Sequence, residues 1–235
     1  MPRLVFDIET IGEDFSKMDE ITQHLITKRI KEPEGEDGYQ SALDELEGGF
    51  ALSPLTGEIV TIGMMDVDTG KGAIYYQAPG ADIPDSEENG MKFKAMSEKE
   101  MLLRFWELAE GCDEFIGFNS RAFDVPYMIV RSAVNGIQPT RDLMSNRFVS
   151  LQRDGKHIDL LDQLTFYGAV FSNKGSLHMW CRAFGIKSPK ADGVKGDEVS
   201  GLFREGKFLE IAKYNMGDVI ATAELYDRWN KFIRF

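Results

Sequence analysis

Residues 4–10 read LVFDIET, and this short run sets the architecture expected for the rest of the chain. Large apolar side chains occupy alternate positions in it, which is the period of a β-strand. Side chains two residues apart point to the same face of a strand, so Asp7 and Glu9 present two carboxylates about 7 Å apart on one face. Two carboxylates beside a core repel each other and lose hydration. They therefore either bind a divalent cation through oxygen ligands or reach water at a sheet edge.

The segments that follow predict further strands. Residues 58–66 and 73–77 are rich in β-forming side chains, and the run between them, rich in Asp and Gly, is typical of a hairpin. The first three strands are therefore expected to form an antiparallel unit. Residues 114–118 predict another short strand, which is followed at once by a turn and then by apolar side chains at helical spacing.

Helices dominate the second half of the chain. Ser97 and Glu100 form a capping box in front of an apolar stripe, so a helix is expected to begin there and to end at Gly111. Helical periodicity also marks the ranges 125–130, 160–166, 177–184 and 208–232. Together with the strands, these helices predict an α/β domain with a mixed sheet.

Residues 13–56 interrupt this pattern with a polar, acid-rich stretch that carries only short helical pieces, such as residues 21–30. We interpret this stretch as an insertion after the first strand that is partly helical and partly mobile. Residues 78–90 contain several loop-forming residues and are predicted to be a surface connection. We expect a single domain over residues 1–235.

The composition narrows the classes of protein and of site. With 27 basic and 39 acidic side chains, the chain has a net charge of −12, which argues against binding nucleic acid through bulk positive charge. Two cysteines and three histidines are too few for a disulfide framework or a zinc site, so any metal is expected to have oxygen ligands. No stretch approaches the roughly 18 apolar residues of a membrane span, and the first apolar run is too short for a signal peptide. We expect a soluble, cytoplasmic protein.

The charge is uneven along the chain. Residues 119–195 contain 11 basic and 6 acidic side chains, whereas the remainder is strongly acidic. Such a segment is a candidate track for a polyanionic strand, and solvated loops are the alternative explanation. The basic side chains considered for the track are Arg141, Arg147, Arg153, Lys156, Lys174, Lys187, Lys190 and Lys195.

Two later motifs carry further acids. Residues 118–124 read FNSRAFD at the carboxyl end of a predicted strand, where open α/β sheets place their sites. Asp124 is either a site residue or a helix cap. Residues 214–218 read YNMGD inside the last predicted helix, where a spacing of four places Tyr214 and Asp218 on one face. Asp218 is either a site residue or an ordinary solvent-facing acid.

In this order, the three motifs resemble those of the DEDD superfamily of 3′-5′ exonucleases, which has a ribonuclease H-like fold with a mixed five-stranded sheet. Tyr214, four residues before Asp218, resembles the tyrosine subclass, because no histidine of this chain stands near that position. Within the superfamily, the chain is similar to the proofreading domains of family B DNA polymerases and to stand-alone predicted exonucleases related to them. The resemblance covers residues 2–12 and about 57 to the end, and residues 13–56 have no counterpart.

The resemblance implies an enzyme that hydrolyses phosphodiester bonds at the 3′ end of single-stranded DNA by a two-metal-ion mechanism. The implied ligands of two Mg²⁺ or Mn²⁺ ions are four carboxylates, with Asp7 shared by both ions: Asp7, Glu9, Asp124 and Asp218. Tyr214 is assigned to orienting the attacking water, because a phenol with an unperturbed pKa of about 10 is a weak base at neutral pH.

Three residues are the implied substrate contacts. Asn119 would hold the terminal nucleotide by a hydrogen bond, Phe123 would hold it by packing or stacking, and Lys190 lies in a loop that matches a loop of the relatives. Phe123 also fits a plain core residue, and Lys190 a solvated lysine. Asp159 and Asp162 either support the site or cap the helix that follows them.

The motifs span residues 7 to 218, so we expect a stand-alone enzyme without a polymerase. Two alternatives remain from the sequence. One is a 3′-5′ exoribonuclease, because the motifs are shared and no residue is identified that reads the 2′ hydroxyl. The other is a non-catalytic nucleic-acid-binding module on the same fold.

Overall fold

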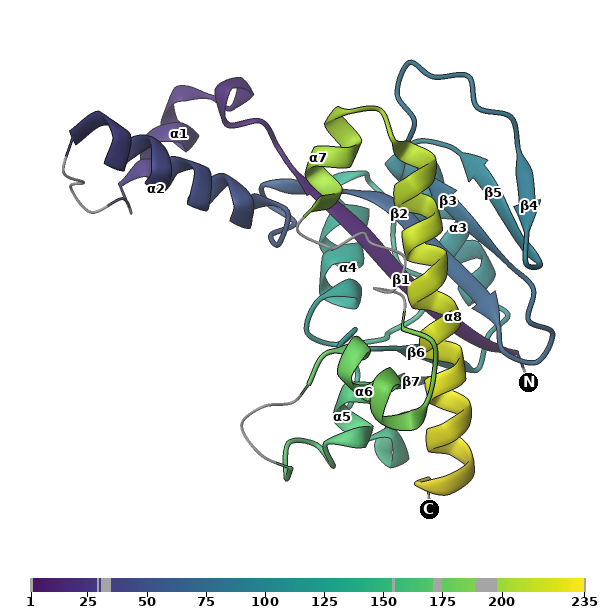
Figure 1. Ribbon diagram of the computed structural model, residues 1–235. Helices are drawn as coiled ribbons and strands as arrows, with labels where there is room; N and C mark the ends of the chain where they lie inside the picture. Colours follow the sequence, from purple (N-terminus) through teal and green to yellow (C-terminus); the bar gives the residue numbers. More distant parts are fainter. Residues whose placement is uncertain are drawn as a thin grey trace.

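A mixed sheet with the strand order β4-β5-β3-β2-β1-β6-β7 forms the centre of the protein (Figure 1). The computed structural model describes residues 2–28, 30, 35–153, 155–170, 175–188 and 198–234. Within these residues the sheet has seven strands. They are β1 (Arg3–Gly12), β2 (Gly57–Asp66), β3 (Gly72–Tyr76), β4 (Ser86–Glu88), β5 (Met91–Ala95), β6 (Glu114–Gly117) and β7 (Lys156–Asp159).

Strand β1 lies inside the sheet, where it pairs antiparallel with β2 and parallel with β6. β2 also pairs antiparallel with β3, so the predicted antiparallel unit of the first three strands is confirmed. The register places Asp7 opposite Gly63 and Glu9 opposite Thr61. Because Phe6 packs into the apolar cluster on one face, the alternation of β1 turns Asp7 and Glu9 to the other face.

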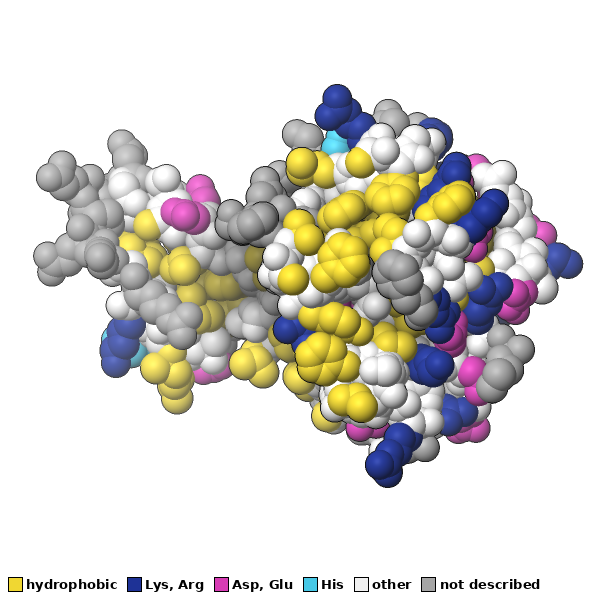
Figure 2. Space-filling model, turned by 90° about the horizontal axis from the view of Figure 1, so that it is seen from below, with side chains coloured by type: hydrophobic (Ala, Val, Ile, Leu, Met, Phe, Trp, Pro, Cys, Tyr) yellow, Lys and Arg dark blue, Asp and Glu magenta, His cyan; other side chains and the backbone are white. Residues whose placement is uncertain are grey.

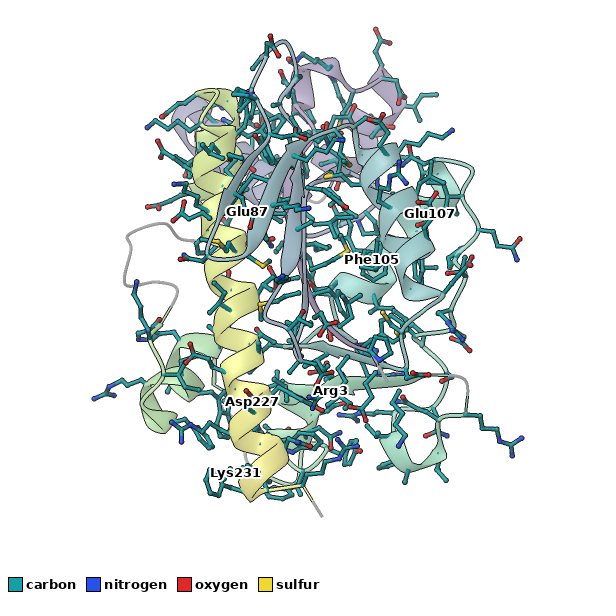
Figure 3. The ribbon with its side chains drawn as sticks, turned by 90° about the vertical axis from the view of Figure 1, so that its right-hand side faces the viewer. Arg3, Glu87, Phe105, Glu107, Asp227 and Lys231 are labelled. Atoms are coloured by element: carbon teal, nitrogen blue, oxygen red, sulfur yellow. The ribbon has the colours of Figure 1, made fainter. Side chains whose placement is uncertain are left out.

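Helices cover both faces of the sheet. Figure 3 shows α8, marked by Asp227 and Lys231, on one side of the sheet and α3, marked by Phe105 and Glu107, on the other. No helix in the described part of the chain is long and apolar enough to cross a membrane. The helices are α1 (Glu20–Thr27), α2 (Gly35–Phe50), α3 (Glu98–Ala109), α4 (Asp124–Val134), α5 (Leu160–Leu164), α6 (Leu177–Phe184), α7 (Val199–Arg204) and α8 (Phe208–Phe232).

The strongest local signals in the sequence correspond to these helices. Ser97 caps α3 and forms the predicted capping box with Glu100, whose carboxylate accepts from the Ser97 backbone N–H at 2.8 Å. The apolar stripe of α3, which includes Phe105, is buried against the sheet. Helix α8 occupies the predicted range 208–232, and its buried side chains pack on the face of the sheet to which Asp7 and Glu9 point.

The insertion forms an arm. Figure 1 shows α1 and α2 extending beyond the end of β1, away from the rest of the molecule. α1 buries none of its side chains, and the rings of Phe15 and Phe50 stack with their centroids 6.5 Å apart at the base of the arm. The helical part of the predicted insertion is therefore confirmed, and the arm leaves the central sheet uninterrupted.

The sheet is larger than expected, because the described residues form seven strands where the resemblance implied five. Residues 86–88, predicted as part of a surface connection, form β4 and pair with β5 at the edge of the sheet. β4 is fully exposed and carries no apolar signal, whereas β5 buries alternate side chains in the ordinary pattern of a strand with one covered face. The short helix α7 was likewise not predicted.

Candidate functional site

Strand β1 and helix α8 bring together acids that are about two hundred residues apart in the sequence. Carboxylate oxygens of Asp7, Glu9 and Asp218 lie within 4.8 Å of one another. The register of β1 shifts directly after Glu9, which marks a β-bulge of the kind that re-aims side chains next to sites. Tyr214 stands one helical turn before Asp218, on the same face of α8.

This group has the chemistry of a divalent-cation site. Burial raises the pKa of Asp7 well above its usual range, and the charges of Asp124, Asp218 and Glu9 raise it further. Burial also raises the pKa of Glu9, with further contributions from Asp218 and Asp124. Oxygen ligands that repel one another in a partly buried place match the preference of Mg²⁺ and Mn²⁺, whose charge would remove the repulsion.

Asp124 stands beside this group rather than within it. It is the first residue of α4, and its Oδ1 accepts a hydrogen bond of 3.1 Å from the backbone N–H of Ile8 in β1. Burial raises the pKa of Asp124 to about 7. The N-cap of α4 is Phe123, so the alternative in which Asp124 caps the helix is wrong. Asp218 is also not the solvent-facing acid of the alternative interpretation, because its exposed fraction is only 9%.

Tyr214 is partly buried against these acids. Burial raises the pKa of its phenol, and the carboxylates of Asp218, Glu9 and Asp7 raise it further. The phenol therefore keeps its proton at neutral pH. In that state it can donate one hydrogen bond and accept another, but it is not a general base.

The loop between β6 and α4 presents Asn119. Asn119 is exposed and adopts a left-handed backbone conformation with φ of 60°. The buried carboxylate of Asp159 accepts hydrogen bonds from the backbone N–H groups of Asn119 and Arg121, at 2.9 and 3.0 Å, and also from that of Leu161. Asp159 thus caps α5 and holds the loop at the same time, so its two suggested roles coexist.

A buried hydrogen bond between Ser120 and His157 also supports this loop. The imidazole of His157 donates from Nδ1 to the Leu143 carbonyl at 2.8 Å, because a carbonyl can only accept. Its Nε2 therefore accepts from the hydroxyl of Ser120, also at 2.8 Å. Burial lowers the pKa of His157 to about 4, so the ring is neutral. Because Ser120 is fully buried, its hydroxyl has a structural role and does not act as a nucleophile.

The other predicted substrate contacts are placed differently. Phe123 is partly buried, and its ring lies 5.4 Å from that of Tyr127, with further packing against the core. Its packing therefore fits the core alternative as well as a role at the rim of the site. Lys190 lies outside the described residues, as do Lys174 and Lys195.

Two side chains of the predicted basic track form hydrogen bonds with other groups of the protein. Arg141 donates to the backbone carbonyls of Ala109 and Glu110, and Arg147 forms two hydrogen bonds, of 2.8 and 2.5 Å, with Asp162. Figure 2 shows the face seen from below, where hydrophobic side chains gather in the middle and lysines and arginines lie around them. On this face, the described lysines and arginines therefore border an apolar surface.

One residue of the site was missed by the sequence reasoning. Asn215 is fully buried between α8 and the sheet, and its Nδ2 donates to Oδ2 of Asp7 at 2.8 Å. A signal was available, because Asn215 interrupts the apolar stripe of α8 between Ile211 and Val219. A buried polar side chain in such a stripe needs a partner, and an acid of another element is the natural one.

Comparisons with known proteins agree with this architecture. The family of predicted 3′-5′ exonucleases related to the exonuclease domain of PolB matches residues 85–233, which include Asp124, Tyr214 and Asp218 but not β1. A search of curated proteins finds no match. The structure of the family B DNA polymerase from the hyperthermophilic archaeon Pyrobaculum calidifontis is similar, with a TM-score of 0.59 and 15% sequence identity. The similarity covers 98% of this chain and 24% of the polymerase, so this chain spans about a quarter of that protein.

The structural likeness shows the fold alone, which is a ribonuclease H-like mixed α/β sheet with flanking helices. The family match covers more than half of the chain. The chain therefore belongs to the family of predicted 3′-5′ exonucleases related to the exonuclease domain of PolB.

Proposed function

We propose that this protein is a divalent-metal-dependent 3′-5′ exonuclease of the tyrosine subclass that acts on single-stranded DNA. The observation that carries the proposal is the approach of the Asp7, Glu9 and Asp218 carboxylates to within 4.8 Å, with Tyr214 on the same helical face. A purely structural cluster of like charges would be costly to maintain, whereas a nuclease needs these oxygen ligands.

The proposed metal ligands are the four acids of the site. Asp7, Glu9 and Asp218 supply the converging oxygens, and Asp124 supplies a fourth carboxylate from the start of α4. When bound, two Mg²⁺ or Mn²⁺ ions would lower the pKa of a water molecule and stabilise the charge on the departing 3′ oxygen. The backbone N–H of Ile8 holds one oxygen of Asp124, which fixes the direction of that carboxylate.

The remaining residues act on the water and the substrate. The protonated phenol of Tyr214 orients the attacking water by a hydrogen bond, and its raised pKa keeps it from acting as the base. Asn119, held outward by Asp159 through its backbone, is assigned to the sugar or base of the terminal nucleotide. Phe123 is assigned to packing against the same nucleotide, and Lys190 to a phosphate of the strand.

A digestion assay tests the proposal. Single-stranded DNA labelled at the 5′ or the 3′ end is incubated with the protein and Mg²⁺ or Mn²⁺. The 3′ label should leave as a mononucleotide at once, while the 5′ label shortens stepwise. Asp7→Ala and Asp218→Ala should lose activity by at least about a thousandfold, in the range typical for removal of a catalytic group.

The matched control is Asp227→Asn, which removes an exposed acid on the same helix α8 (Figure 3). It should digest at the parent rate. An RNA strand of the same sequence, assayed in parallel, decides between deoxyribonuclease and ribonuclease activity. If Asp7→Ala and Asp218→Ala digest as fast as the parent, the assignment of the site is wrong.

A further inference from the structure

Asn215 occupies a position that the packing of α8 would otherwise give to an apolar side chain. It is fully buried, and it follows Ile211 and precedes Val219 on the face of α8 that lies on the sheet. An amide in such a place loses its hydration, and this loss must be offset by hydrogen bonds. Its position in the interface therefore indicates a specific partner.

That partner is the carboxylate of Asp7. Asn215 Nδ2 donates to Asp7 Oδ2 at 2.8 Å, and among the described residues it is the sole hydrogen-bond donor to this side chain. Three further carboxylates, those of Asp124, Asp218 and Glu9, also repel the carboxylate of Asp7. Without a restraint, this repulsion would turn the carboxylate away from its neighbours.

An asparagine is chemically suited to this restraint. A lysine or arginine at position 215 would pair with Asp7 but would also place a positive charge where cations are expected to bind. The amide of Asn215 is a neutral donor, so it holds one oxygen of Asp7 without reducing the negative charge of the group. Outer hydrogen-bond partners of this kind orient metal ligands in many sites.

Strand β2 leaves the space that this contact needs. Gly63 lies opposite Asp7 in the sheet, directly beneath Asn215. A Cβ atom at position 63 would stand 2.1 Å from Asn215 Oδ1, which is far inside contact distance, and 2.8 Å from a methyl group of Val219. Glycine in a strand interior often marks such a close approach. The missing side chain at position 63 and the amide at position 215 therefore form one structural unit.

We propose that Asn215, in the space left by Gly63, is a positioning residue that holds the Asp7 carboxylate in place for divalent-metal binding. The inference rests on the proposed function in one respect, namely that Asp7 is a metal ligand. Asn215 touches neither the nucleic acid nor the reacting atoms in this proposal. It acts through the orientation of Asp7 alone.

The test measures Mn²⁺ binding to the full chain without nucleic acid, from the electron paramagnetic resonance signal of the free ion. Asn215→Leu keeps the branching of the side chain at Cγ and suits the apolar interface, but it removes the donor. It should weaken Mn²⁺ binding on the order of tenfold or more. Ile211→Ala, which damages the same interface one turn earlier, should lose stability and keep its Mn²⁺ affinity within about twofold.

Gly63→Ala tests the same contact from β2 and does not depend on the folding of Asn215→Leu. It should weaken Mn²⁺ binding because the new methyl group displaces the Asn215 amide. In an Asn215→Ala background the amide is gone and only the side-chain contacts with Val219 and Ile74 remain, so adding Gly63→Ala should cause little further loss of Mn²⁺ binding. Additive losses in the double variant would overturn the proposed unit of Gly63 and Asn215.

The outcomes separate this inference from the proposed function. If Asn215→Leu binds Mn²⁺ as tightly as the parent while Asp7→Asn does not bind, the positioning role is wrong and the metal site stands. If the parent itself binds no Mn²⁺, the proposed metal site and the positioning role are both wrong. If Ile211→Ala loses Mn²⁺ affinity as strongly as Asn215→Leu, the effect belongs to the interface in general and the inference is overturned.

Discussion

Asp218 combines a proposed catalytic role with a cost in stability. Its carboxylate lies with those of Asp7 and Glu9, and the native state holds the three charges close together. Groups whose pKa is raised in the folded protein destabilise it at high pH, and this destabilisation is relieved as the pH falls through the raised values. Residues of this kind explain why active sites are often less stable than their surroundings.

We therefore predict that Asp218→Asn abolishes cleavage but stabilises the metal-free protein. Removing one of the repelling charges should raise the free energy of unfolding by about 1 kcal/mol at pH 8. Urea unfolding in the presence of a chelator measures this change. The gain should shrink at pH 5, where the acids of the parent take up protons. A loss of stability at pH 8 would contradict the electrostatic description of the site.

His157 makes the opposite contribution to the pH dependence. Its pKa falls from the ordinary 6.5 of a histidine to about 4 in the folded protein, so the unfolded chain binds more protons between these values. The stability that comes from the neutral ring is complete above pH 6.5 and is lost as the pH falls toward 4. The difference between the folded and unfolded pKa of His157 corresponds to about 3 kcal/mol of the free energy of unfolding.

This assignment is measurable without unfolding the protein. The NMR signals of the His157 ring should keep the positions of the neutral Nδ1-protonated form from pH 8 down to about pH 5. The three histidines of the chain make the spectrum simple to assign. A titration midpoint of His157 above pH 6 would contradict the burial of this ring in its neutral form.

The loop between β6 and α4 depends on one carboxylate from β7. Asp159 accepts from the backbone of Asn119, Arg121 and Leu161. Replacing it with alanine leaves these N–H groups without their partner, which should cost about 2 to 3 kcal/mol of stability. Because the loop carries Asn119, Asp159→Ala should raise KM for the strand more than it lowers kcat.

Steady-state digestion of one DNA strand by Asp159→Ala and by the parent measures this split. Asp162→Ala is the matched control, because Asp162 lies in α5, the helix that Asp159 caps, and its carboxylate pairs with Arg147 and not with the loop. If Asp159→Ala instead lowers kcat and leaves KM unchanged, the loop does not position the substrate.

The elements themselves were predictable to different extents. α8 and α3 could be predicted because long apolar periodicity and a capping box are local signals. β4 could not, because a short edge strand with fully exposed side chains has no apolar pattern that distinguishes it from a loop. β5 does alternate, with Met91 and Phe93 buried and Lys92 and Lys94 exposed, but the run is too short to identify a strand by itself. The pairing of β5 with β3, and of β4 with β5, is a property of the assembled sheet and not of either segment itself.

The residues of the site could be predicted where short sequence motifs contain them. Asp7 and Glu9 follow from strand alternation, and Tyr214 and Asp218 follow from helical spacing. The contact between Asn215 and Asp7 joins residues from the two ends of the chain, and no local pattern encodes which strand a buried asparagine will meet. The same holds for the dependence of this contact on a glycine in β2.

Divalent cations should stabilise the folded protein as a whole against thermal unfolding. Binding to the folded state alone raises stability in proportion to the logarithm of ligand concentration above the dissociation constant. Mn²⁺ should therefore raise the Tm of the parent in a concentration-dependent way, while Asp7→Asn should show little change. A thermal scan with increasing Mn²⁺ measures this effect. An equal rise in both proteins would indicate cation binding elsewhere on the acidic surface.

The most direct measurement is an anomalous diffraction map from crystals of the parent protein soaked with Mn²⁺ and a nucleoside monophosphate. Our interpretation predicts Mn²⁺ peaks in direct contact with the carboxylates of Asp7, Glu9 and Asp218, next to the phosphate of the nucleotide. Mn²⁺ bound only at other acids, at a concentration that supports digestion in solution, would contradict it.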